Sequence, residues 1–307
     1  MYKRQGTILA PYGGVYRDSP NEAMAALIPT PGETTTATLM SHGYDPDLST
    51  WSPFHGAVYA VTESLAKICA AGGDVSRARL TFQEYFERLR REPARWGKPL
   101  AALLGAYRAQ MELGIGAIGG KDSMSGSFER MDVPPTLVSF AVTTEKTAAI
   151  VPNHFKAAGH KLVLLAPEYG KDGLPAAASL LALFDRVHGL LSSGRAVSAY
   201  TPGFGGPAEA VMKMAFGNGL GFAFDSGLSL EDIFAYRYGA FLLELASDED
   251  IGLNMGRVLG EPEFIYKGEL LALDRVLAIY ENKLESVYSC NIPEENVGAE
   301  LFSFQAA

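Results

Sequence analysis

A polar, glycine-rich segment near the middle of the chain has the residue types needed to hold an anion. It runs from Gly119 to Ser125 and reads Gly-Gly-Lys-Asp-Ser-Met-Ser. Glycines let backbone amides approach an anion closely, a lysine supplies a positive charge, and hydroxyls donate further hydrogen bonds. The Walker pattern Gly-x-x-x-x-Gly-Lys-Ser/Thr is absent from the sequence. The residues alone leave two interpretations open, a site for a phosphorylated small molecule and an ordinary polar turn.

Other side chains with chemical potential are scattered along the sequence. The two cysteines, Cys69 and Cys290, are far apart and have neither zinc-ligand nor disulfide-framework spacing. The five histidines also lack metal-ligand spacing, and only His42 and His55 flank a loop that enters a predicted helix. Three aspartates could contact a cation, although such residues more often cap turns and helices: Asp45, Asp47 and Asp74. These patterns do not predict a metal centre.

The composition is that of a globular protein with an acidic surface. The 307 residues are 48% hydrophobic and 20% charged, with a net charge of −9. This balance can bury a substantial core, and the negative charge argues against nucleic-acid binding. The N-terminus lacks an apolar signal core, and no run of about 18 apolar residues occurs. We expect a cytoplasmic chain that contacts neither nucleic acid nor membrane, and one that starts within a longer protein.

The polar segment is expected to lie between two strands. A short buried strand is predicted at 115–118 and a longer one at 137–143, where apolar residues are continuous or alternate. Helical spacing of apolar residues predicts helices at 56–71 and 100–113, each followed by glycine. Residues 119–127, which include three glycines, are predicted to be entirely loop.

A boundary between two parts of the chain is predicted near Val151. Beyond it, strands are predicted at 161–165, 197–200, 221–225, 240–245 and 263–267, and helices at 175–192, 207–216, 248–259 and 271–285. Mixed elements without strict alternation predict two α+β lobes, at 30–150 and 151–290. Residues 1–29 are predicted to be a partial or linker segment, and 291–307 a tail.

Five stretches, taken together, resemble a known family: Arg79–Phe86, Trp96–Leu100, Gly119–Ser125, Asp132–Phe140 and Gly203–Gly219. They make the chain similar to the second half of the synthetase region of phosphoribosylformylglycinamidine synthase, over most of its length. The run Lys-Asp-Ser-Met-Ser is specific in this setting, whereas a glycine turn alone would be a weak signal.

The resemblance implies an α+β, aminoimidazole ribonucleotide synthase-like fold, with an N-terminal α/β lobe that pairs in a pseudo-dimer and a C-terminal α/β lobe. It implies a ligase of de novo purine biosynthesis that converts formylglycinamide ribonucleotide to formylglycinamidine ribonucleotide with ATP, Mg²⁺ and glutamine-derived ammonia. Because only the second half matches, the first synthetase half and the glutaminase domain are implied as partners. The isolated chain is then expected to be inactive, and neither Cys69 nor Cys290 is expected to be the glutaminase nucleophile.

The resemblance also implies roles within the polar segment. Related shorter enzymes have Gly-Asn-Val-Ser at this place, which matches Gly120 to Ser123. Gly120 is then expected to contact nucleotide, and Ser123 the ribonucleotide substrate. Lys121 stands where those enzymes have a metal ligand and would contact phosphate directly, while Asp122 would orient Lys121 or hydrogen-bond the loop. The alternative is that these residues only shape the interface between lobes.

The family's longer bacterial enzymes hold an auxiliary nucleotide with Mg²⁺ ions in this half. The positions that match the metal ligands are Met40, Glu63, Lys67 and Phe204, and only Glu63 keeps an oxygen ligand. Glu63 and Lys67 are four residues apart on one predicted helix face and are expected to form an ion pair. The resemblance therefore predicts that the auxiliary nucleotide site of this half is lost.

Two alternatives to a ligase fragment stay open, a non-catalytic scaffold half and a stand-alone synthase-like paralogue that acts as a homodimer. If the N-terminal lobe pairs with a partner, its sheet face is expected to be apolar. The residues predicted to form that face are Ile115, Ile118, Leu137, Val138, Phe140 and Val142.

Overall fold

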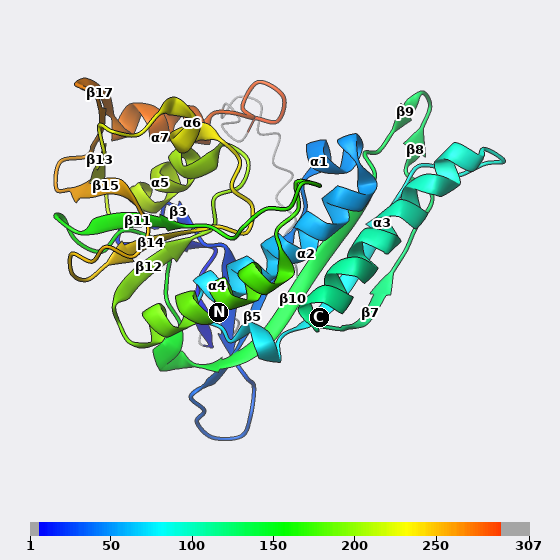
Figure 1. Ribbon diagram of the computed structural model, residues 1–307, viewed down its shortest axis with the longest axis horizontal. Coiled ribbons are helices and arrows are strands. Elements are labelled where there is room, and N and C mark those ends of the chain that lie inside the picture. The colour runs from blue at the N-terminus through cyan, green and yellow to red at the C-terminus, as the bar shows by residue number, and fades with distance from the viewer. Residues whose placement is uncertain (1–5, 290–307) are drawn as a thin grey trace, which may run out of the picture.

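The computed structural model describes residues 6–289, which form two large sheets with helices packed against them (Figure 1). One sheet belongs to the N-terminal part of the chain and the other to the C-terminal part. Within the described residues, no helix has the length and apolar character needed to cross a bilayer.

The first sheet has six strands in the order β1–β4–β5–β10–β6–β7. Their bounds are Thr7–Leu9 (β1), Ala23–Leu27 (β4), Thr36–Gly43 (β5), Arg79–Tyr85 (β6), Ala117–Lys121 (β7) and Thr136–Lys146 (β10). All neighbours pair antiparallel except β6 and β7, which are parallel. Two small hairpins lie outside this sheet, Tyr12–Gly13 (β2) with Ser19–Pro20 (β3), and Ser127–Phe128 (β8) with Met131–Asp132 (β9). Strand β7 is therefore an edge strand of the first sheet.

The helices of the N-terminal part are α1 (Pro46–Trp51), α2 (Pro53–Ala70) and α3 (Pro93–Leu113). Helix α2 begins where the Ser52 hydroxyl accepts a hydrogen bond from the His55 amide and Pro53 occupies the first turn. Beyond its last turn, Gly72 has a φ of +92°, a left-handed conformation that favours glycine. Most residues of α2 are buried, so this helix forms the centre of the N-terminal lobe.

The second sheet has seven strands in the order β12–β14–β11–β15–β13–β16–β17. Their bounds are Lys161–Leu165 (β11), Ala196–Tyr200 (β12), Gly221–Phe224 (β13), Phe241–Leu245 (β14), Leu253–Leu259 (β15), Glu263–Tyr266 (β16) and Glu269–Ala272 (β17). The helices of this part are Ala177–Ser192 (α4), Gly206–Phe216 (α5), Leu230–Phe234 (α6) and Leu273–Glu281 (α7). Short 3₁₀ turns occur at Val75–Arg77 and Thr147–Ala149.

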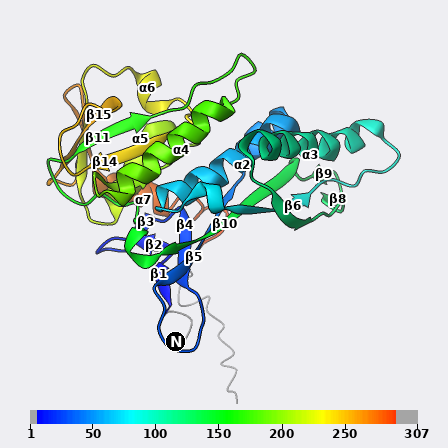
Figure 2. The ribbon, with the colours of Figure 1, turned by 60° about the horizontal axis from the view of Figure 1, so that its bottom comes forward.

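Helices α2 and α4 join the two lobes through one continuous hydrophobic core. Leu65 and Ile68 of α2 lie in the same buried cluster as Leu183 and Val187 of α4. Figure 2 shows these two helices side by side between the sheets. Burying an aliphatic side chain of this size contributes roughly 1.5–3 kcal/mol, so this contact fixes the lobes against each other.

Residues 6–29, which fall in the segment predicted to be partial or a linker, supply two strands of the first sheet. Strand β4 pairs with β5 along its whole length, and β1 pairs with β4. The segment is rich in alanine and glycine and has little apolar alternation, so its partner strand, and not its own pattern, makes it a strand.

Three further elements differ from the sequence prediction. The helix predicted at 248–259 is wrong, because Leu253–Leu259 is strand β15, hydrogen-bonded between β11 and β13. Gly256 within it has a φ of +133°, which helical backbone does not allow. Residues 119–121 belong to strand β7 and not to a loop, and α3 begins at Pro93, seven residues before the predicted start.

The predicted apolar sheet face is only partly confirmed. Leu137 and Ile115 are 2% and 3% exposed, so they belong to the core and not to a partner surface. Val138, Phe140 and Val142 alternate with buried residues along β10 and lie half-buried on the face away from the helices. The two-residue period of a strand separates these sets, and the sequence of β10 does not reveal which set faces inward, because the buried set includes Ser139 and Thr143 while the outer set includes Phe140.

Candidate functional site

The polar segment predicted to bind an anion lies at the edge of the first sheet, at the end of β7. A Cβ on Gly120 would lie 2.7 Å from the Phe82 carbonyl oxygen, so glycine is needed where β7 passes β6. Beyond the strand, the Ser123 amide donates to the Glu84 carbonyl (3.1 Å), and the Ser123 carbonyl accepts from the Phe86 amide (2.9 Å). Backbone bonds therefore hold the loop against β6.

The side chains of this loop remain accessible to a ligand. Lys121 and Asp122 are exposed, and among the described residues the Lys121 ammonium has neither an ion pair nor a hydrogen bond. The Ser123 and Ser125 hydroxyls lie 2.9 Å apart and share a hydrogen bond. A cation and two hydroxyls at the anchored end of β7 suit the binding of a phosphate or another anion.

Glu84 is a buried carboxyl next to this loop that the sequence analysis did not single out. It is 6% exposed, and its Oε1 has no hydrogen-bond partner among the described residues. Burial, with a smaller contribution from the Asp122 carboxylate, raises the pKa of Glu84 to about 7. The sequence contained a signal for the burial of Glu84. Glu84 follows Leu80 and Phe82 at a two-residue period, which places it on the face of β6 turned to the core.

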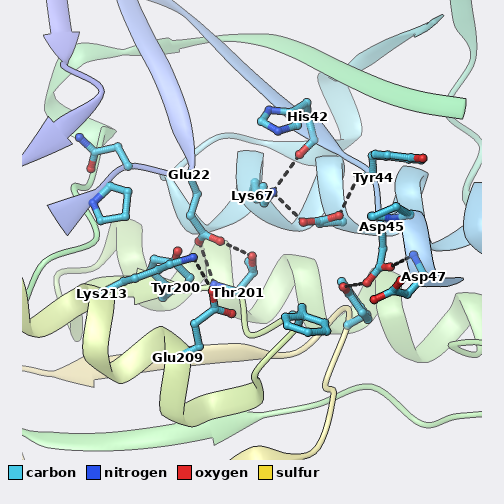
Figure 3. A pocket seen from close by; sticks show the side chains of 17 residues that line it. Glu22, His42, Tyr44, Asp45, Asp47, Lys67, Tyr200, Thr201, Glu209 and Lys213 are labelled. Atoms are coloured by element: carbon cyan, nitrogen blue, oxygen red, sulfur yellow. Dashed lines mark hydrogen bonds and ion pairs between the residues drawn. The ribbon is translucent and has the colours of Figure 1, made fainter. Parts of the chain in front are cut away.

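A second candidate site is a cleft of about 480 Å³ between the two lobes (Figure 3). Helix α2 contributes Glu63 and Lys67, and helix α5 contributes Glu209 and Lys213. The segment before β4 contributes Glu22. Residues 120–123 do not line this cleft, so the structure places the predicted substrate loop and the predicted auxiliary site apart.

The predicted ion pair between Glu63 and Lys67 is confirmed. The Lys67 ammonium lies 2.7 Å from Glu63 Oε1 and also donates to the His42 carbonyl (3.0 Å). The other carboxylate oxygen, Glu63 Oε2, accepts from the Tyr44 amide (3.0 Å). Both oxygens of Glu63 are thus engaged by donors of the chain itself.

These residues do not fit a Mg²⁺ ion at Glu63. Hard cations require several oxygen ligands, whereas an ammonium stands beside Glu63, and Phe204 lines the cleft with an aromatic ring. Met40 is 42% exposed on β5 and is not part of the cleft lining. No group of three or more histidine, cysteine, aspartate or glutamate side chains suited to a metal occurs between residues 6 and 289.

The cleft also contains a carboxyl that links the two lobes. Glu22 is partly buried, and its Oε2 accepts a hydrogen bond from the Thr201 amide (2.8 Å) just after β12. The Thr201 hydroxyl donates to Glu22 Oε1. Withdrawal from water raises the pKa of Glu22 to about 7, although the nearby Lys67 charge opposes this shift. Sequence reasoning missed Glu22 because its partner is 179 positions away.

Two of the three aspartates considered as cation ligands have structural roles, and the third, Asp47, lines the inter-lobe cleft. Asp45 caps α1 by accepting from the Asp47 and Leu48 amides, and its other oxygen accepts from the Tyr238 hydroxyl. Asp74 caps the following 3₁₀ turn. These contacts match the capping role that such residues most often have.

We expect Glu63→Ala to lower the free energy of unfolding by about 1–3 kcal/mol, since it removes hydrogen bonds to a charged group. The two side chains of this pair are only 14% and 16% exposed, so loss of the carboxylate leaves Lys67 poorly solvated. Urea denaturation measures the change.

Glu112→Ala is the matched control, because Glu112 and Arg108 form a pair with the same i,i+4 spacing and exposures of 42% and 37%. That variant should lose only about 0.3–0.5 kcal/mol. Equal losses in the two variants would mean that the cleft pair is an ordinary surface pair.

In comparisons with known proteins, no protein-family model and no curated protein matches the chain. Solved structures do match its fold. The Thermotoga maritima PurL complexed with ATP aligns with a TM-score of 0.64 and 14% identity, over 87% of this chain and 47% of that chain. The same protein complexed with FGAR aligns at 0.61 and 12%, over 87% and 49%.

A thiamine monophosphate kinase from Aquifex aeolicus also aligns, with a TM-score of 0.53 and 13% identity. That alignment covers 80% of this chain and 93% of the kinase. The chain thus spans about half the length of the PurL structures and nearly the whole of the kinase. These matches confirm the predicted synthase-like mixed α/β fold.

Proposed function

We propose that this chain is the second synthetase half of an ATP-dependent ligase that converts formylglycinamide ribonucleotide to formylglycinamidine ribonucleotide. The observation that carries the proposal is the exposed Gly120–Ser123 loop, on a fold shared with a protein solved with FGAR, ATP and ADP. The family resemblance of the sequence supports this specific reaction, and the shared fold supports an enzyme that uses ATP. In this proposal the ammonia comes from glutamine through a partner domain.

The loop residues would bind the anionic parts of the substrates. In the reaction, the amide oxygen of the ribonucleotide attacks the γ-phosphorus of ATP, and ADP leaves. Ammonia then displaces the phosphate from the activated carbon. Ser123 would donate a hydrogen bond to the ribonucleotide, Lys121 would contact phosphate, and Gly120 would offer backbone to the nucleotide. ATP and Mg²⁺ would be held mainly by the first half, which completes the site.

The inter-lobe cleft would have a structural role in this half. Two ion pairs, Glu63–Lys67 and Glu209–Lys213, lie in the cleft with a separation of 2.7 Å in each case. Their ammonium groups would neutralise the cleft carboxylates, a role that the metal ions of an auxiliary nucleotide would otherwise have. The Glu22 contact to Thr201 joins the lobes across the same cleft. We therefore propose that side chains of the chain itself replace an auxiliary nucleotide.

The purified 307-residue chain is expected to form no amidine from formylglycinamide ribonucleotide, ATP, Mg²⁺ and ammonia. About half of the composite site is contributed by the partner half. Adding a first synthetase half should restore product formation, measured as amidine and ADP released in equal amounts. Turnover by the chain alone would contradict the divided site, and no turnover with the partner present would contradict the ligase function.

A stand-alone enzyme is the second candidate. It is favoured by one observation, the coverage of 93% of a thiamine monophosphate kinase by this chain. Such a paralogue would complete its site by pairing with a second copy. It predicts ATP-dependent turnover by the chain alone, so the same experiment separates the two candidates. A scaffold half without catalytic residues predicts that substitutions in the loop leave the rate of the assembled enzyme unchanged.

A further inference from the structure

We infer that the outer face of helix α3 docks onto the same face of a second copy of this chain, with the two helices antiparallel. Figure 1 shows α3 at the edge of the molecule, on the side away from the second sheet. This surface is separate from the outer face of the first sheet and from the cleft between the lobes. The inference does not depend on the proposed ligase function.

The outer face of α3 is apolar over its whole length. It consists of Trp96, Leu100, Leu103, Leu104, Tyr107 and Met111, whose exposed fractions range from 48% to 65%. Between positions 100 and 111, the residues that are about half exposed or more are all apolar, and the only charged residue, Arg108, is ion-paired within the chain. A helix face turned to water normally carries charged or polar residues, so a stripe of this length marks a binding surface.

The opposite face of α3 already has its partner. Ala102, Ala106 and Ala109 are buried beneath the helix. At Gly105, an added Cβ would lie 2.2 Å from the Phe54 carbonyl oxygen of α2, which shows how closely the two helices approach. The exposed stripe therefore cannot turn inward and be covered by the chain's own core.

The order of residues in the stripe fits an antiparallel pairing with itself. About a two-fold axis between positions 103 and 104, Leu103 faces Leu104, Leu100 faces Tyr107 and Trp96 faces Met111 of the other copy. Two leucines meet at the axis, and the outer two pairs each join an aromatic ring with a flexible aliphatic or thioether side chain. A methionine sulfur packs favourably against an aromatic ring. An isologous interface requires this kind of self-complementary pattern.

The area is sufficient for a specific dimer. Each half-exposed side chain of this size offers on the order of 100 Å², so the two stripes together would bury roughly 1,200 Å², the lower bound for specific interfaces. Two charged residues of α3 that flank the stripe are already paired within the chain. Lys98 lies 2.8 Å from Glu87, and Arg108 lies 3.0 Å from Asp172. An uncharged, apolar partner such as the same helix therefore fits better than a charged one.

Sedimentation equilibrium of the 307-residue chain should show a concentration-dependent dimer. Leu104→Glu, at the centre of the stripe, should raise the dimer dissociation constant at least about thirtyfold, as expected for an interface hot spot. Met40→Glu is the control, because Met40 is exposed on the first sheet and not on α3. Circular dichroism should show that both variants are folded.

Cysteine cross-linking tests the register directly. The double variant Leu100→Cys/Tyr107→Cys should give a covalent dimer on mild oxidation, because each new thiol faces its counterpart across the axis. Either single variant should cross-link poorly, since like positions would be seven residues, or about 10 Å, apart along the helices. The unaltered chain controls for its own cysteines. A strictly monomeric chain, a dimer lost only in Met40→Glu, or equal cross-linking of the single variants would overturn the inference.

Discussion

Lys121→Ala is expected to lower kcat/KM of the assembled ligase by about a hundredfold or more, because it deletes a cation that faces phosphate. The Lys121 side chain is exposed and has no competing partner among the described residues, so its charge is free for a ligand. Ser123→Ala removes one hydrogen bond to a charged group, worth roughly 1.5–3 kcal/mol. That loss corresponds to about a ten- to hundredfold decrease in kcat/KM.

Steady-state kinetics of the enzyme with both synthetase halves present measures these effects. Lys171→Ala and Ser226→Ala are suitable controls, since both positions are exposed and lie outside the loop and the inter-lobe cleft. Glu63→Ala should leave the kinetic constants nearly unchanged, because Glu63 is paired within the chain. If Glu63→Ala abolishes activity while Ser123→Ala has no effect, the catalytic and structural assignments of the two sites are reversed.

The contribution of Glu22 to the free energy of unfolding is expected to fall as the pH rises from 5 to 8, and Glu22→Gln should remove that contribution. The pKa of Glu22 in the folded state is raised to about 7. At pH values between the unfolded-state pKa and this folded-state pKa, Glu22 is therefore protonated in the folded state and ionised in the unfolded state. Stability from this group is therefore fully present below the unfolded pKa and is lost as the pH rises through about 7. The change amounts to roughly 1–3 kcal/mol.

Urea denaturation at a series of pH values measures this dependence. Glutamine at position 22 keeps an oxygen that can accept from the Thr201 amide but does not ionise, so the slope between pH 5 and 8 should decrease. Glu84→Gln should reduce the slope independently, because the pKa of Glu84 is also raised to about 7. Glu33→Gln changes an exposed carboxylate and is the control. Parallel pH profiles for the unaltered chain and Glu22→Gln would show that Glu22 does not remain protonated in the folded state.

The sequence determined those features whose signals are local. Strand β11 has the predicted bounds, and α4 and α5 begin within two residues of their predicted starts, because apolar spacing and glycine turns lie within each segment. The Glu63–Lys67 pair followed from helical geometry alone. The polar segment that reaches from Gly120 to Ser123 was identified from its residue types, although the strand within it was not.

Tertiary structure decided the features that depend on distant partners. Strand β15 was predicted as helix, because its apolar residues fit either period until β11 and β13 supply hydrogen bonds on both sides. Glu22 became part of the inter-lobe cleft only through Thr201, and Glu84 became a buried carboxyl only through the packing around β6. Apolar residues at helical spacing predicted the part of α3 from 100 to 113. The packing of its alanine face on α2 decides which of them stay exposed, because burial is a property of the neighbours that the fold brings together.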